Sequence, residues 1–482
     1  MIRFRLGMAN PRTGIRPRLI AAAVVLALGA AAAARVEAQS PQQPRAPRGY
    51  RGLFGGTSVP DPTRTRQELT ITTSLVAGYD DNLAAAALGG SSTPNGQEGR
   101  DGYLGQGQLD LHYYRGKLER SFMFDGSAYG TGYGDLGVGF VKGGTMSVAG
   151  ATKVRTRDSF RASQRVSFDP LFTLGALSVL DGLASPAPLP GSNTSTGLTE
   201  QRSWSTQTGL DYSLAASRRD TVNVSYGFVA RRYPTGDDVP GNSDNHRAAV
   251  DLTHPFNRRV SFQTSYDYNY GRYQDADGIR PLTEHTISAG PQIEKVFSRT
   301  RRLQLTSSVG AQYVRTLGSV SLRRTPVDYW SPFGEAAVQL DLSRAWDLTL
   351  NYRRGTTVLP EVTTESFVTD AFTFGLGGVV GSRLELDASA GLSTGTTAAA
   401  AGGRAKNQTL TWSSTARWAF NRRFAATLSY DYYEYEFTNT GDLPSTFPPG
   451  SSRNTIRAGV TIWLPLIGNY IAERSGGRSG RS

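Results

Sequence analysis

Residues 260–270 read Val-Ser-Phe-Gln-Thr-Ser-Tyr-Asp-Tyr-Asn-Tyr, and their side chains alternate in character. The even positions are apolar or aromatic apart from Thr264, whereas the odd positions carry Ser, Gln, Ser, Asp and Asn. Successive side chains of a β-strand point to opposite faces, so one face of this stretch is apolar and the other polar. Its length matches a tilted membrane-spanning strand of about 9 to 11 residues and exceeds the usual soluble strand of about 5 to 6 residues. The stretch predicts a strand between lipid and water.

The same alternation recurs from Glu68 to Leu464, and eighteen such stretches follow one another along the chain. A sheet with lipid on one face must close on itself, because each unpaired backbone group costs several kcal/mol in hydrocarbon. The sequence therefore predicts an all-β fold, a closed antiparallel transmembrane β-barrel of about 18 strands, within a range of 16 to 20.

The connections between these stretches are predicted to alternate strictly between short basic turns and long loops. Residues 217–220 (Ser-Arg-Arg-Asp) and 256–259 (Phe-Asn-Arg-Arg) are short turns, whereas residues 82–100, 170–202 and 394–407 are long. Outer-membrane barrels have short periplasmic turns and longer extracellular loops. With an even strand count, both termini are expected on the periplasmic side.

Aromatic residues are expected to form two girdles at the levels of the lipid headgroups. One girdle comprises tyrosines at the far ends of the ascending strands: Tyr129, Tyr226, Tyr270, Tyr313, Tyr352 and Tyr432. The other comprises residues beside the short turns: Phe256, Phe297, Trp346, Trp418, Phe420 and Trp463.

Composition excludes several other classes of protein. The mean hydropathy is −0.36, and no run of 18 apolar residues follows the N-terminal region, so a bundle of membrane helices is excluded. The absence of cysteine excludes a disulfide scaffold and any thiolate metal site. The positive charge is modest and placed at turns, which argues against a nucleic-acid partner.

The N-terminus has the features of an export signal, predicted over residues 1–38. Arg12, Arg16 and Arg18 precede an apolar stretch, and Val36-Glu37-Ala38 forms a small-x-small cleavage site. Cleavage removes six arginines and one glutamate, which lowers the formal net charge from +12 to +7. A membrane-anchor helix is the alternative, although the apolar run is shorter than the ~20 residues of a span.

Three further regions complete the predicted organisation. Residues 39–65 are rich in Pro, Arg and Gly and are expected to form a flexible periplasmic segment, with a polybasic binding role as the alternative. Residues 66–467 form the predicted barrel, and residues 468–482 a disordered periplasmic tail. The expected location is the bacterial outer membrane, with lipid and the barrel-assembly machinery as partners.

Two short motifs resemble known families. Residues 457–464 (Arg-Ala-Gly-Val-Thr-Ile-Trp-Leu) resemble the C-terminal strand signal of outer-membrane barrels, carried here by Arg457, Gly459, Ile462 and Leu464. The chain departs from that signal in continuing to Ser482.

The second motif, Tyr79, Asp80, Asp81 and Asn82, resembles the Tyr-Asp-x-Asn element of the beta-barrel porin 2 family. This resemblance implies an outer-membrane barrel associated with exopolysaccharide production and export. A simple polar entry into the following loop is the alternative interpretation of the same residues.

Polar positions of the predicted strands place charges of both signs on the wall of the lumen. The acidic residues are Asp110, Asp125, Asp211, Asp251, Asp267, Asp341, Glu385, Asp387 and Asp431. The basic residues are Arg161, Arg165, Arg231, Arg353, Arg417 and Arg457. Charges sorted into rings or ladders would select solutes by charge; mutual pairing that merely hydrates the wall is the alternative.

The favoured function is a water-filled channel for passive passage of polar solutes or polysaccharide. Tyr114, Tyr129 and Tyr433 are candidate stacking surfaces for carbohydrate. A structural or adhesive barrel without an open pore, using residues 170–202 as a binding loop or plug, is one alternative. A hydrolase is another, resting on the histidines His112, His246, His254 and His285. No spacing requires a nucleophile beside them, so no enzyme, cofactor or metal site is expected.

Overall fold

The computed structural model of the chain describes residues 66–82, 101–117, 120–134, 140–169, 203–233, 242–275, 278–298, 300–316, 327–343, 345–359, 363–397, 406–438 and 450–468. The predicted export signal, the segment at 39–65 and nearly all of the C-terminal tail lie outside these ranges. Within them, no helix is long and apolar enough to cross a membrane.

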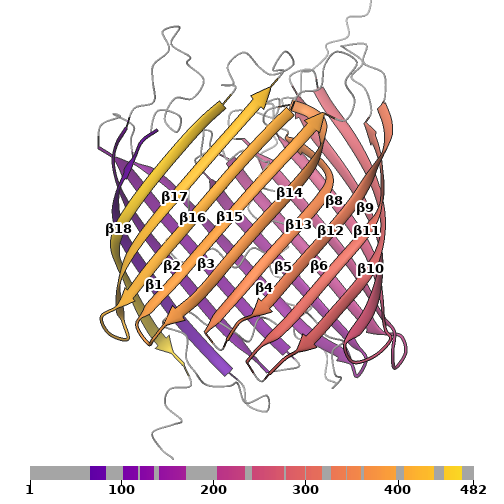
Figure 1. Ribbon diagram of the computed structural model, residues 1–482, viewed down its shortest axis with the longest axis horizontal. Coiled ribbons are helices and arrows are strands. Elements are labelled where there is room, and N and C mark those ends of the chain that lie inside the picture. The colour runs from indigo at the N-terminus through magenta and orange to yellow at the C-terminus, as the bar shows by residue number, and fades with distance from the viewer. Residues whose placement is uncertain are drawn as a thin grey trace, which may run out of the picture.

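The described residues form eighteen strands (Figure 1). In chain order they are β1 (Arg66–Asp80), β2 (Gly102–Lys117), β3 (Arg120–Tyr133), β4 (Val141–Arg155), β5 (Asp158–Asp169), β6 (Ser203–Ala215), β7 (Thr221–Arg232), β8 (Ser243–Pro255), β9 (Val260–Asp275), β10 (Gly278–Val296), β11 (Arg302–Thr316), β12 (Val327–Asp341), β13 (Trp346–Leu359), β14 (Thr363–Val380), β15 (Leu384–Thr397), β16 (Lys406–Ala419), β17 (Phe424–Thr438) and β18 (Gly450–Ile467).

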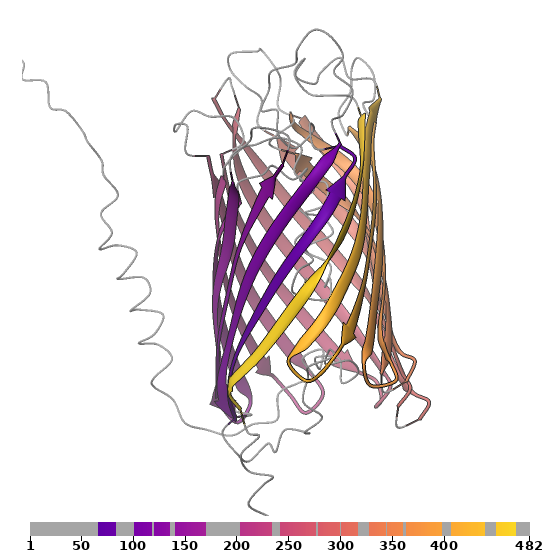
Figure 2. The same cartoon turned by 90° about the vertical axis from the view of Figure 1, so that its left-hand side faces the viewer.

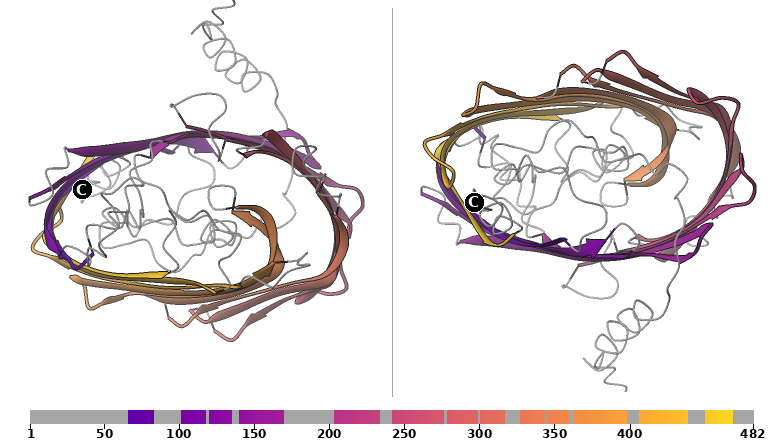
Figure 3. Two further views of the ribbon diagram at one scale, coloured as in Figure 1. Left: turned by 90° about the horizontal axis from the view of Figure 1, so that it is seen from above. Right: turned by 90° about the horizontal axis from the view of Figure 1, so that it is seen from below.

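Each strand pairs antiparallel with its neighbours in sequence, and β1 also pairs with β18. Figure 2 shows β1 in indigo running beside β18 in yellow, and the end views of Figure 3 show an oval ring. Closure satisfies the backbone groups of the two terminal strands, as a sheet in hydrocarbon requires. The predicted closed barrel of 18 antiparallel strands is confirmed.

The outer face of the ring is apolar. Residues directly opposite each other in neighbouring strands share a face, and Leu75 of β1 lies opposite Val460 of β18. On the far side of the ring, Ile287 of β10 lies opposite Tyr266 of β9. All four side chains are exposed, and Leu75 reaches 62%. A complete ring of exposed apolar side chains is matched to hydrocarbon rather than to water.

The aromatic residues sort into girdles with two exceptions. Beside the short turns, Phe256, Trp418 and Phe420 are each about 60% exposed, as a headgroup-level girdle requires. Tyr129 instead lies opposite Gln108, and Trp463 lies opposite Thr72, so both point to the inner face. Their girdle assignment was wrong because their parity within the strand, rather than their height, decides which solvent they meet.

The short turns are closed by side chains that bind the backbone. In the Phe-Asn-Arg-Arg turns, Asn257 Oδ1 accepts the backbone N–H groups of Arg259 and Val260 at 2.7 and 3.0 Å. Asn421 Oδ1 accepts those of Arg423 and Phe424 in the same way. Asparagine and serine favour such turns because their side chains replace a backbone acceptor. Between β14 and β15, Gly381 adopts a φ of 65°, which L-residues rarely do.

Asp220, in the turn before β7, contacts His254 near the end of β8. The Nδ1 atom of His254 lies 2.7 Å from Asp220, and Ser217 donates a hydrogen bond to the same carboxylate at 2.6 Å. The hydrogen bond from His254, followed by that from Ser217, holds the pKa of Asp220 below its usual range. The basic turn therefore keeps its acid ionised.

The expected strict alternation of short and long connections is wrong at two places. Only residues 276–277 separate β9 from β10, and only residues 360–362 separate β13 from β14. The strands themselves are long here, since β10 has 19 residues and β14 has 18. Residues that the sequence pattern assigned to loops belong to paired strands instead. Pairing between strands extends past the point where the alternation of polarity ends.

The wall is interrupted near these long strands. The ladder between β12 and β13 runs from Asp341–Asp347 up to Gly334–Arg354 and stops there, although both strands continue. In Figure 3 the orange strands β13 and β14 turn into the ring in both end views. Above the interruption the described ends of the two strands, residues 355–359 and 363–367, stay paired and fold inward; they are called the inward-folded hairpin.

Candidate functional site

The inner wall of the barrel is lined by polar rows. Register places the following charged residues on these rows: Asp110, Asp125, Arg161, Arg165, Asp211, Arg231, Asp251, Asp267, Asp341, Arg353, Glu385, Asp387, Arg417, Asp431 and Arg457. Acid and base frequently stand directly opposite each other, as Arg161 does to Asp211 and Arg417 to Glu385. The wall is therefore mixed in sign.

Several of these charges are paired. Arg247 lies 2.5 Å from Asp267, and Arg417 lies 3.0 Å from Glu385. Arg417 and Glu385 are both almost fully buried, so their mutual attraction offsets a desolvation cost that neither would bear alone. In the described part of the chain, no ion pair involves Arg161 or Arg165, although Arg161 stands directly opposite Asp211.

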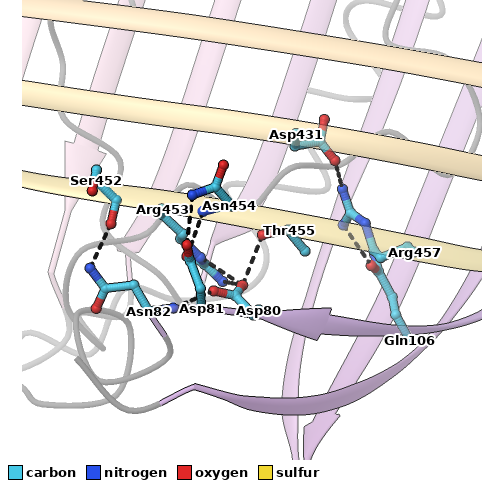
Figure 4. Close-up of polar contacts among 10 residues, drawn as sticks. All are labelled: Asp80, Asp81, Asn82, Gln106, Asp431, Ser452, Arg453, Asn454, Thr455 and Arg457. Carbon is cyan, nitrogen blue, oxygen red and sulfur yellow. Dashed lines mark hydrogen bonds and ion pairs between the residues drawn. The ribbon is translucent and has the colours of Figure 1, made fainter.

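The Tyr79–Asn82 motif lies at the seam where the barrel closes (Figure 4). Asp80 is completely buried and accepts hydrogen bonds from Arg453 Nε at 2.7 Å and Thr455 Oγ1 at 2.9 Å. Arg453 Nη2 lies 2.6 Å from the same carboxylate. Asp80 therefore ties the first strand to the last by a buried, charge-assisted contact.

The next two residues bind the outer side of the same seam. Asp81 accepts the backbone N–H and the side-chain Nδ2 of Asn454, both at 2.6 Å. Asn82 donates from Nδ2 to the carbonyl of Ser452 at 2.7 Å. Asp80–Asn82 thus form a clamp against Ser452–Thr455 of β18, whereas Tyr79 of the same motif contacts Tyr103 of β2.

Two glycines let the seam strands approach. A Cβ on Gly459 would lie 2.0 Å from the carbonyl oxygen of Leu75, and one on Gly78 would lie 2.4 Å from that of Ile456. Only glycine fits backbone this close. In residues 457–464, Gly459 serves strand closure, Ile462 and Leu464 lie on the outer row, and Arg457 lies on the inner row.

An aromatic ladder runs up the inner face of β17. Tyr433, Tyr435 and Phe437 succeed one another at every second residue, with ring centroids 5.9 and 6.0 Å apart. Register places Thr409 opposite Tyr435 and Asn407 opposite Phe437. Of the predicted stacking residues, Tyr433 belongs to this ladder, whereas Tyr114 and Tyr129 lie on the inner rows of β2 and β3.

Several polar atoms of β14 to β18 have no hydrogen-bond partner among the described residues. They include Thr369 Oγ1, Ser393 Oγ, Thr397 Oγ1, Asn407 Oδ1, Tyr433 OH and Arg457 Nε, all on residues at most 5% exposed. Leaving such a group unpaired costs about 1 to 3 kcal/mol. Because these atoms are buried, they do not form part of the open surface of the lumen.

A small cavity adjoins the lower end of the ladder. Gln106, Tyr133, Tyr433, Arg453 and Arg457 line it. Arg457 donates to Gln106 Oε1 at 3.2 Å and also pairs with Asp431. Both arginines of the cavity are neutralised by carboxylates, since Arg453 binds Asp80. The cavity is therefore polar and close to neutral.

Two histidines have the carboxylate partner that a catalytic histidine needs. His112 Nδ1 lies 2.5 Å from Asp125, on the inner face of β2 and β3, and His254 contacts Asp220 at the turn before β7. His246 and His285 point outward instead and accept or donate a hydrogen bond with Tyr226 and Tyr266, each at 2.9 Å. The described residues contain no group of three or more acidic or histidine side chains arranged to hold a metal.

Comparison with known proteins shows resemblance of shape only. No family model matches the chain, and no curated protein matches it. Solved structures do: Acinetobacter baumannii OccAB3 is 11% identical, with 83% of this chain and 99% of that chain covered and a TM-score of 0.41. Pseudomonas aeruginosa OccK2 (OpdF) in complex with glucuronate is 12% identical, with 84% and 98% covered and a TM-score of 0.40. Pseudomonas aeruginosa OpdQ is 11% identical, with 85% and 100% covered and a TM-score of 0.38.

Sequence reasoning missed the clamp partner Arg453 and two rings of the aromatic ladder, Tyr435 and Phe437. Arg453 directly follows residues 438–452, which the sequence pattern assigns to a loop, and its partner Asp80 is 373 residues away. Tyr435 and Phe437 follow Tyr433 at the strand period, so the period-2 rule applied past Tyr433 predicts them.

Proposed function

We propose that the chain forms a water-filled channel in the bacterial outer membrane for passive passage of polar solutes. The observation that carries this proposal is the pairing of an apolar outer ring with polar inner rows on a closed 18-stranded barrel. Barrels of about 16 to 18 strands are wide enough for an aqueous lumen. The short turns are assigned to the periplasm, together with both termini.

Among polar solutes, saccharides fit the inner wall best. Sugar rings present C–H faces that stack on aromatic rings, and hydroxyls that both donate and accept hydrogen bonds. Tyr114 and Tyr129, half-buried on the inner rows of β2 and β3, offer the first kind of contact, and the polar side chains of the inner rows offer the second. This agrees with the polysaccharide association that the Tyr79–Asn82 resemblance implies.

The channel function is tested by conductance. Purified protein inserted into planar lipid bilayers in potassium chloride is expected to produce discrete current steps, because water and ions fill the lumen. Heat-denatured protein serves as the control. Insertion of folded protein without any current step would assign the chain to structural or adhesive barrels instead.

Saccharide binding is tested by current block. Maltohexaose is expected to interrupt the current, and Tyr114→Ala is expected to weaken that block by up to about tenfold, since an aromatic stacking contact contributes about 0.5 to 1.5 kcal/mol and 1.4 kcal/mol is tenfold. Tyr113→Ala is the matched control, because Tyr113 lies next along β2 on the outer row. Equal loss of block in both variants, or none in either, would remove Tyr114 from the solute path.

A further inference from the structure

The inward-folded hairpin leaves a strand edge behind it. Above Gly334, residues 327–333 of β12 pair with β11 but have no ladder partner on the β13 side among the described residues.

The hairpin leaves the wall as a unit. The ladder between β13 and β14 continues beyond the interruption, through Thr356–Val368 and Thr357–Phe367. At the point of divergence, Arg354 pairs with Asp370 at 3.0 Å, and Tyr352 donates to Asp370 at 2.8 Å. These cross-strand contacts join β13 to β14, and they place the bend beside Gly355.

The hairpin is held by polar contacts from its outer row to the inner wall. Thr356 donates its backbone N–H and its hydroxyl to Gln312 Oε1 of β11, both at 3.0 Å. Tyr329 of β12 donates to Ser366 Oγ of β14 at 2.9 Å. Thr356 and Ser366 belong to the row that faces lipid lower down, so the hairpin has turned its outer face onto the lumen wall.

The wall under the hairpin is apolar, unlike the rest of the lumen. Tyr273, Leu282 and Val314 form a buried cluster on the inner rows of β9, β10 and β11, and Tyr329 packs against it. Val314 is fully buried. A cluster of this kind facing water would be unfavourable at about 25 cal/mol per Å². It therefore stabilises the folded-in position.

We propose that the hairpin is a gate with two docking positions. In the first it lies on the inner wall and occupies part of the lumen, as in this structure (Figure 3). In the second it pairs with the free edge of β12. Continuing the register past Gly334–Arg354 sets Pro332 opposite Thr356. Backbone pairing then replaces the contacts with Gln312, and the lumen widens. The gate rests on the channel function proposed above.

Thr356 distinguishes the two positions, because its neighbour changes from Gln312 to Pro332. The chain has no cysteine, so any cross-link must form between the two introduced cysteines. Gln312→Cys with Thr356→Cys, joined by a short bifunctional thiol reagent, locks the folded-in position. Pro332→Cys with Thr356→Cys locks the second position by a disulfide, since directly opposed strand residues lie within disulfide range. The three single-cysteine variants and reduction with dithiothreitol are the controls.

Both pairs are expected to cross-link in membranes. Locking the folded-in position is expected to keep the lower conductance. The disulfide between positions 332 and 356 is expected to raise the conductance about twofold, because the ends of two strands then leave the lumen and join the wall, and the lumen widens with the number of strands in the wall. Failure of that disulfide to form while the other pair links fully would overturn the gate, as would identical conductance in both locks. If no variant conducts, the channel function fails, whereas cross-linking still reports the hairpin positions.

Discussion

Asp80→Ala is expected to lower the free energy of unfolding of the barrel by about 3 to 5 kcal/mol, because it leaves a buried arginine without its carboxylate. Asp80 is fully buried, and Arg453 is only 7% exposed. The two strands of the seam, β1 and β18, are the first and last strands of the sheet. The substitution therefore weakens the pairing that closes the barrel. Urea unfolding in detergent micelles, followed by tryptophan fluorescence, measures the change.

The matched control is the neighbouring carboxylate. Asp81 binds Asn454 on the outer side of the same seam, where the contacts are exposed. Asp81→Ala is therefore expected to cost only about 0.5 to 1.5 kcal/mol for each hydrogen bond lost. The double variant Asp80→Ala, Arg453→Ala is expected to be more stable than Asp80→Ala alone, since no unpaired charge remains. Equal stability of the Asp80 and Asp81 variants would show that burial of the pair does not matter.

The barrel was predictable because one physical cause acts on every strand. Lipid outside and water inside impose alternation, and a stretch such as 260–270 reports it without knowledge of the rest of the chain. Strand number followed from the same pattern. Tyr129 and Trp463 were misplaced for a related reason, since their height was considered before their parity.

The inward-folded hairpin was not predictable from alternation. Thr356 and Ser366 keep the parity of the lipid-facing row, yet they bind the inner wall, because the strand bends as a whole. The apolar cluster at Val314 and Leu282 was not predictable either, because apolar residues on an inner row only interrupt the alternating pattern. The pairing of Asp80 with Arg453 was not predicted for a different reason. A contact between the first and last strands produces no local periodicity in the sequence.

Val314→Asp is expected to release the hairpin and raise the single-channel conductance without unfolding the barrel. Val314 is fully buried in the cluster with Tyr273 and Leu282, and Tyr329, which donates to Ser366 of the hairpin, packs against this cluster. A carboxylate confined there without a partner costs several kcal/mol, whereas movement of the hairpin returns it to water. The strand ladders on both sides of β11 are unaffected, because only an inner-row side chain changes.

Thr306→Asp provides the comparison that isolates the hairpin. Thr306 lies on the same inner row of β11, opposite Gln292 and Ala337, away from the apolar cluster. A carboxylate there adds the same charge to the lumen without disturbing hairpin docking, so the open-channel current is expected to change little. Bilayer recordings of the two variants measure the difference, and cross-linking at Pro332 and Thr356 in the Val314→Asp background should become faster. Equal conductance of both variants would mean that added charge, rather than release of the hairpin, sets the current.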